Sequence, residues 1–195
     1  MMVTIAFWCA LLLPGYAVAR MVAPRDLESG LPGALAISFL AALVVLSPVS
    51  ILCYLLSCPV AVLSSACILV LIAGVVQISR RGWWRDIAKL VAGGLGIELL
   101  ILVTDVVIGG RVGAFLGGGD ERMHLARVRF LLDHGFSNVS PYTHPGGFFN
   151  VYNTNLLHGL YASCSQLSGV DVPGAWCASL VLAKSLIAGA YYFLA

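Results

Sequence analysis

The sequence is poor in charged residues. Among its 195 residues, 11 are Lys or Arg and 9 are Asp or Glu, so charged side chains make up 10% of the chain. Hydrophobic residues make up 60%, and the mean hydropathy is +0.96. Soluble globular domains carry about 25% charged residues, so this composition excludes that class. It predicts an integral membrane protein.

Motifs for metals and for nucleic acids are also missing from the sequence. The six cysteines show no metal-ligand spacing such as CxxC. The net charge of +2 is not gathered into a basic face with interleaved aromatic residues. We therefore expect no nucleic-acid partner, and the sequence establishes neither a metal site nor a cofactor.

Long apolar runs recur along the chain. A transmembrane helix needs about 20 apolar residues to cross ~30 Å of hydrocarbon. Runs of about this length occupy residues 2–19, 34–57, 59–78, 87–108 and 173–195. The sequence thus predicts an all-α, polytopic membrane protein with about five transmembrane helices, whose partners include membrane lipids.

Two clusters of basic residues predict the topology. They flank the first run and separate the third from the fourth: Arg20, Arg25, Arg80, Arg81, Arg85 and Lys89. Basic residues stay in the cytoplasm, so residues 109–171 face outside in a plasma (inner) membrane. We divide the chain into a four-helix membrane region, 1–108, an external loop, 109–171, and a fifth transmembrane helix, 172–195. Because the sequence stops within an apolar run, we interpret it as a fragment of a longer protein.

The external loop begins with a charged helix. In the stretch GGGDERMHLARVRFLLDHG, Asp120 is a suitable N-cap for a helix that ends near His134. The helical period places Asp120, His124, Arg127 and His134 on one side. A second polar strip comprises Arg122, Arg129 and Asp133. An ordinary surface helix needs one wet face, whereas this one has two, so the first face is able to bind an anion or relay a proton. The alternative is an ordinary helix that Asp120 merely caps.

A second amphipathic helix is predicted over residues 149–167. One stripe of it is polar: Asn150, Thr154, His158, Tyr161 and Ser165. Two interpretations stay open: the stripe meets water at the membrane interface, or it lines a substrate site. Between the two helices the turn SPYTHPGGFF contains His144, which either faces a ligand or hydrogen-bonds within the turn.

Four motifs together resemble a known family. They are LLLPGY near the N-terminus, the acidic helix GGGDERMHLARVRFLLDHG, the histidine turn THPGGFF, and LSGVDVPGAW leading into the last apolar run. This pattern is similar to the N-terminal part of the GT-C membrane glycosyltransferases, mainly over residues 117–195. The resemblance implies transfer of a sugar from a polyprenyl-phosphate-linked donor to an acceptor on the outer face of the membrane. Three additional helices before the acidic loop depart from the family, and we interpret them as an added module.

The resemblance also implies roles for the polar residues. Asp120 and Glu121 match the family's acidic pair, with Asp120 as general base and Glu121 orienting the acceptor or a divalent metal ion. One pair supplies too few ligands to establish that metal. Arg127 and His144 are candidates for contacting the donor phosphate, and His124 and His158 for further substrate contacts. The family's donor-binding residues lie beyond this chain, so we expect enzyme activity only from the longer protein.

Charged residues also occur inside the apolar runs. Glu98 lies near the middle of the fourth run and Lys184 near the middle of the fifth, and an unpaired charge there is costly. We predict a structural ion pair between them in preference to a proton pathway. An alternative function is a transport-type or non-catalytic membrane protein that uses Glu98, Asp105 and Lys184 as an intramembrane polar site. The sequence does not indicate the oligomeric state.

Overall fold

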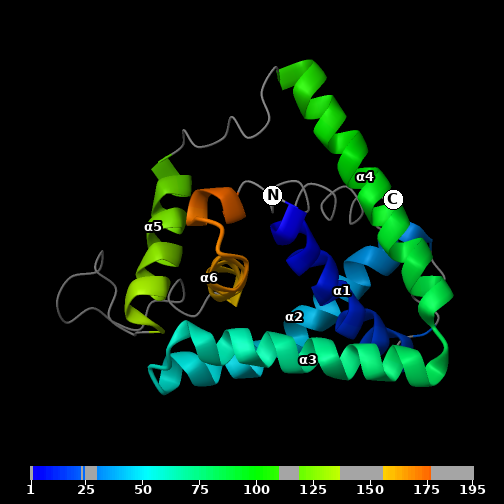
Figure 1. The fold of residues 1–195 in the computed structure, drawn as a ribbon, viewed down its shortest axis with the longest axis horizontal. Coiled ribbons are helices and arrows are strands. Elements are labelled where there is room, and N and C mark those ends of the chain that lie inside the picture. The colour runs from blue at the N-terminus through cyan, green and yellow to red at the C-terminus, as the bar shows by residue number, and fades with distance from the viewer. Residues whose placement is uncertain (1, 23, 25–29, 110–118, 137–155, 177–195) are drawn as a thin grey trace.

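The computed structural model describes residues 2–22, 24, 30–109, 119–136 and 156–176. At a few helical positions, among them Glu98, Asp105, Asp120 and Glu121, it describes the backbone only. The regular structure in these ranges is α-helical throughout, as predicted. The helices are α1 (Met2–Val22), α2 (Leu31–Leu55), α3 (Val60–Arg81), α4 (Trp84–Gly109), α5 (Gly119–His134) and α6 (Leu156–Ser168) (Figure 1). A further helical turn starts at Val172, where Asp171 Oδ1 accepts a hydrogen bond from Gly174 N–H at 3.2 Å.

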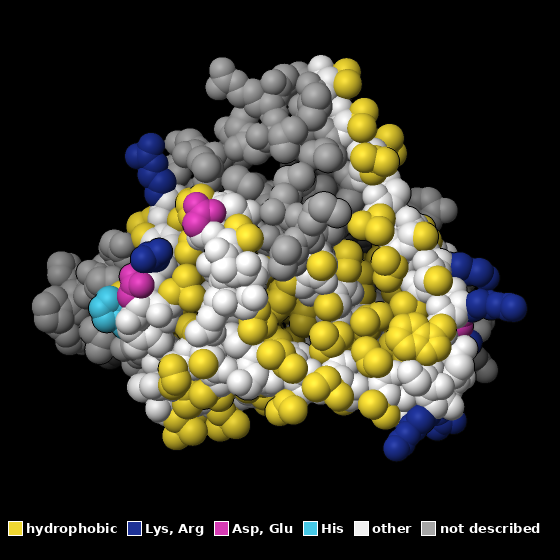
Figure 2. All heavy atoms as spheres, in the orientation of Figure 1, with side chains coloured by type: hydrophobic (Ala, Val, Ile, Leu, Met, Phe, Trp, Pro, Cys, Tyr) yellow, Lys and Arg dark blue, Asp and Glu magenta, His cyan; other side chains and the backbone are white. Residues whose placement is uncertain are grey.

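The first four predicted apolar runs each form a helix. Within the described residues, Gly33–Leu55 and Val60–Arg81 are long and apolar enough to cross a membrane, and a shorter apolar stretch covers Ala6–Val22. Large hydrophobic side chains are exposed along α2, α3 and α4, and Figure 2 shows many of them on one face of the molecule. These features support a membrane location, while passage through the membrane five times stays a prediction.

The α1 helix packs against α2 and α3 through close backbone contacts. A Cβ atom added to Gly15 of α1 would overlap the carbonyl oxygen of Ser38 in α2. A Cβ added to Gly74 of α3 would lie 2.6 Å from the Cα atom of Pro14. Only glycine permits so close an approach at these positions, so α1 crosses both of its neighbours at backbone distance.

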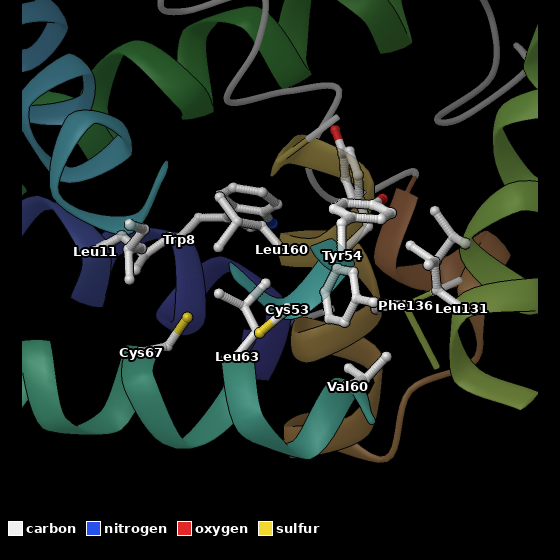
Figure 3. Close-up of a cluster of buried hydrophobic side chains, with 14 of the residues drawn as sticks. Trp8, Leu11, Cys53, Tyr54, Val60, Leu63, Cys67, Leu131, Phe136 and Leu160 are labelled. Atoms are coloured by element: carbon white, nitrogen blue, oxygen red, sulfur yellow. The ribbon is translucent and has the colours of Figure 1, made fainter. Parts of the chain in front are cut away.

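The α5 helix is anchored on the turn between α2 and α3. The helix ends at His134. Gly135, which follows it, has a φ of 76°, and Phe136 donates its N–H to the Cys58 carbonyl oxygen at 2.8 Å. The Phe136 ring packs edge-on against Tyr54 with a centroid distance of 4.7 Å (Figure 3). Both rings belong to the larger buried cluster, which α1, α2, α3, α5 and α6 share.

The α6 helix is the most deeply buried helix of the described structure. Its side chains from His158 to Ser165 are all buried, and a Cβ added to Gly159 would lie 2.8 Å from Leu63 of α3. By contrast, α4 contributes Ile87 and Leu90 to a second cluster near its start, and its later turns leave the bundle (Figure 1). The larger buried cluster therefore lies at the α5–α6 side, and most of the predicted site residues belong to these two helices.

Candidate functional site

The two polar strips of α5 have opposite environments. Arg129 and Asp133 form an exposed pair with 3.1 Å between Nε and Oδ2, and Arg122 is exposed as well. The strip with His124 and Arg127 instead turns inward, because Val128 and Leu131 beside it are fully buried. The prediction that this strip is a wet face is therefore wrong for Arg127, which is buried, while His124 is partly buried.

Arg127 is the central feature of the inward strip. Its side chain is only 6% exposed, and none of its three guanidinium nitrogens has a hydrogen-bond partner. The guanidinium carbon lies 5.6 Å from the centroid of the Phe130 ring, one turn along the helix. The Tyr54 hydroxyl interacts with the guanidinium, but this hydroxyl is neutral, and no hydrogen bond of regular geometry joins it to Arg127 or to another described residue. Arg127 therefore carries a buried positive charge with no counter-charge among the described residues.

A histidine pair connects α5 to α6 close to this charge. His124 Nδ1 and His158 Nε2 are 2.8 Å apart, so one ring donates its N–H to the other. His124 stacks on Trp176 at a centroid distance of 5.6 Å, and Tyr161 packs between Trp176 and Trp8 at 4.7 and 5.2 Å. The pair thus has a wall of aromatic rings beside it.

His158 is held in its neutral form. Its side chain is 3% exposed, and this burial is the main reason why its pKa falls from 6.5 to about 4. The neighbouring His124 and the charge of Arg127 lower it further. Its other ring nitrogen, Nδ1, is buried without a hydrogen-bond partner. At neutral pH His158 therefore carries no charge, whereas the neighbouring Arg127 does.

The cluster suits an anionic ligand. Burial of an isolated charge costs several kcal/mol, whereas a desolvated cation–π contact stabilises it by only about 2 kcal/mol. The Phe130 contact therefore does not offset the burial of Arg127. A phosphate or carboxylate would supply the missing charge and accept hydrogen bonds from the guanidinium, in the bidentate geometry that arginine favours.

Three of the four predicted substrate contacts come together. His124, Arg127 and His158 belong to one cluster, although the sequence places His158 on a separate helix. His134 lies outside it: this ring is exposed and stacks on Phe130 at 4.5 Å. His144 lies outside the described residues.

The acidic pair belongs to the first turn of α5. The helix begins at Gly119, so Asp120 is within the first turn instead of at the predicted N-cap. Position 120 precedes His124 by one turn on the same helix face. Glu98 and Asp105 belong to α4, and Lys184 lies outside the described residues, so the Glu98–Lys184 ion pair stays a prediction.

The described part of the polar stripe of α6 is buried. The structure describes this helix from Leu156, so residues 149–155 of the predicted helix lie outside the described residues, and His158, Tyr161 and Ser165 are all buried. Ser165 donates its hydroxyl to the Val170 carbonyl oxygen at 2.5 Å. The interpretation of this stripe as the wet side of an interfacial helix is therefore wrong for the described residues, because α3 and α5 cover it.

Sequence reasoning missed Tyr54 and Trp176. Tyr54 comes from the last turn of α2, and no local pattern connects it with a helix more than sixty residues later. No group of three or more potential metal ligands occurs in the described part of the chain. Comparison with known proteins finds no match: no family description, curated protein or solved structure is similar to this chain.

Proposed function

We propose that this chain is part of a membrane glycosyltransferase. It transfers a sugar from a polyprenyl-phosphate-linked donor to an acceptor on the outer face of the plasma (inner) membrane. The observation that carries the proposal is the buried guanidinium of Arg127, which lacks a counter-charge among the described residues. The phosphate of a lipid-linked sugar provides that charge.

The depth of the cluster favours a lipid phosphate over a soluble anion. Tyr54, beside Arg127, lies in the last turn of the candidate span Gly33–Leu55. The phosphate of a membrane lipid sits where the hydrocarbon region ends, which is also where such a span ends. An anion anchored by a lipid tail would therefore reach Arg127 at the depth at which membrane lipids carry their phosphate.

The acidic pair supplies the base in this proposal. Asp120 removes the proton from the acceptor hydroxyl, whose oxygen attacks the anomeric carbon of the sugar. The bond between that carbon and the phosphate oxygen breaks, and the polyprenyl phosphate leaves with the electron pair. Arg127 stabilises the negative charge that develops on it. The one-turn separation of positions 120 and 124 supports this arrangement.

The remaining polar residues act as substrate contacts. The neutral ring of His158 provides one hydrogen-bond donor or acceptor towards the ligand at its buried Nδ1, and His124 lies beside this ring. His144 is a second candidate for the phosphate. Glu121 orients the acceptor hydroxyl or binds a divalent metal ion that accompanies the donor. The outward location of residues 109–171 follows from the positive-inside rule.

The test is sugar transfer by the full-length protein in lipid vesicles that contain a labelled polyprenyl-phosphate sugar. Arg127→Gln should lower kcat/KM by at least ~10²-fold, because a charge-assisted contact to the leaving group is lost. The matched control is Arg129→Gln on the exposed face of the same helix, which should change it by less than about 3-fold.

The acidic pair gives a second arm of this test. Asp120→Asn keeps the size of the side chain but removes the proton acceptor, and it should lower transfer by at least ~10²-fold. Glu121→Gln should cost less, unless a metal ion depends on it. Full transfer by both Arg127→Gln and Asp120→Asn would disprove the mechanism and favour a transport-type or scaffold role.

A further inference from the structure

The turn after α2 brings two cysteines together. Cys58 donates its backbone N–H to the Cys53 carbonyl oxygen at 2.9 Å, and Ser57 donates to Tyr54 at 3.4 Å. Ser57, which lies between the two cysteines in the sequence, has a φ of 51°. These bonds define a Schellman motif, in which the side chains three positions before the helix end and two positions after it are in contact. Here those side chains are Cys53 and Cys58.

The two thiols differ in access. They are close enough to interact with each other, and neither is in a disulfide. Cys53 is 1% exposed and lies in the core beside Leu63 and Tyr54 (Figure 3). Cys58 is partly exposed at the end of the candidate span. This is the arrangement of an accessible attacking thiol with a buried resolving thiol behind it.

We propose that Cys53 and Cys58 form a reversible disulfide. The Cys58 thiolate attacks an external disulfide, gives a mixed disulfide and releases one thiol. The Cys53 thiol loses its proton and attacks the Cys58 sulfur, which releases the second thiol. Two cysteine thiols are thereby oxidised to one disulfide, and the external disulfide is reduced to two thiols. The external oxidant is a small-molecule or protein disulfide.

The position of the pair links its redox state to the candidate site. The Cys58 carbonyl oxygen holds Phe136 at the end of α5, and Tyr54, next to Cys53, packs on Phe136. A bond between positions 53 and 58 would fix the turn on which α5 is anchored. The basic clusters that place residues 109–171 outside also predict an outward α2–α3 turn. In the cell this oxidation rests on that predicted location, because disulfides form and persist outside the cytoplasm. The chemistry itself is tested on the purified protein and does not depend on topology or on sugar transfer.

The experiment follows thiol oxidation in the full-length protein. All other cysteines are replaced by Ser, oxidised glutathione is added, and the masses of the intact protein and its peptides are measured. The parent protein should lose two hydrogen masses and retain no glutathione. In Cys53→Ser the resolving thiol is missing, so one glutathione should stay on Cys58. In Cys58→Ser the buried Cys53 should react at least ~10-fold more slowly than Cys58 does.

Three results would overturn the proposal. The first is a stable glutathione adduct in the parent protein, because Cys53 would then fail to resolve it. The second is an unmodified parent under conditions that modify the Cys53→Ser protein. The third is equally fast modification of Cys53 in the absence of Cys58. Cys53→Ala provides a second resolving-site variant that keeps a small apolar residue in the core, so a loss of folding in Cys53→Ser does not block the test.

Discussion

The two turns that flank α3 share a backbone motif but differ in chemistry. At the α3–α4 turn, Gly82 has a φ of 69° and Trp83 donates its N–H to the Ile78 carbonyl oxygen at 3.1 Å. Ile78 and Trp83 belong to one apolar cluster. At the α2–α3 turn, Ser57 occupies the position of the glycine, and two thiols replace the apolar pair. The α3–α4 turn therefore ends its helix with an apolar contact, whereas the α2–α3 turn carries two thiols, which are reactive groups.

The cations near the two ends of α3 differ in their exposure to water. Arg80, Arg81, Arg85 and Lys89 are exposed near the α3–α4 turn, and Figure 2 shows Lys and Arg side chains projecting there. Water hydrates these charges, so they report on the topology and need no partner. Arg127 lies near the α2–α3 turn, where the protein shields it from water. A buried cation with no counter-charge in the described part of the chain favours an anionic ligand, which is why the α2–α3 end is the candidate site.

The largest expected difference between the two ends is their access from outside the cell. Ser57 and Ser79 are exposed and lie at opposite ends of α3, so each is changed to Cys in a cysteine-free protein. An impermeant thiol reagent should label Ser57→Cys in intact cells, and Ser79→Cys only after permeabilisation. Labelling of both in intact cells would show that α3 does not span the membrane. The reverse pattern would invert the topology.

The buried cation should reduce the stability of the ligand-free protein. Arg127→Met removes, at similar volume, a buried charge that has no counter-charge among the described residues, so we expect the free energy of unfolding to rise by about 1–4 kcal/mol. Arg129→Met, on the exposed face of α5, should change it by no more than ~0.5 kcal/mol. Thermal unfolding in detergent measures both. A loss of about 3–5 kcal/mol in Arg127→Met would mean that the guanidinium has a structural counter-charge after all.

The histidine pair should make stability depend on pH. The pKa of His158 is lowered from 6.5 to about 4, so the unfolded chain binds its proton first as the pH falls. Full stability is present above pH 6.5 and is lost progressively down to about pH 4, by roughly 3 kcal/mol at most. His158→Gln should remove most of this loss, whereas the exposed His134→Gln should not. An equal pH dependence in all three proteins would contradict the buried neutral state of His158.

Exchange of the residues at the two turns should give the smallest effect. Ser57 has a left-handed backbone, so Ser57→Gly should raise the free energy of unfolding by about 0.5–1 kcal/mol. Gly82→Ser should lower it by a similar amount, since nothing lies within 4 Å of an added Cβ and only the backbone strain counts. Chemical or thermal unfolding of the two variants measures this. Two changes of the same sign would show that side-chain contacts, not backbone strain, dominate at these turns.

The sequence determined the elements that depend on local composition. Runs of apolar side chains predicted α1 to α4, because a long apolar run in a chain with so little charge forms a helix wherever it lies. The glycine run before Asp120 placed the start of α5 within one residue of its observed start at Gly119. Helical periodicity also grouped His124 with Arg127, since that spacing depends only on residues of one helix.

Tertiary structure alone decided which of the polar faces became a candidate site. Periodicity states which side chains share a face, but not which face a neighbouring helix covers, so the inward turn of Arg127 was not predictable. His158 and Tyr54 join this arginine only because α6 is buried between α3 and α5, and because α5 is anchored on the α2–α3 turn. The pairing of Cys53 with Cys58 likewise depends on the left-handed backbone of Ser57. These features arise from burial and from contacts between distant segments, which local sequence patterns do not contain.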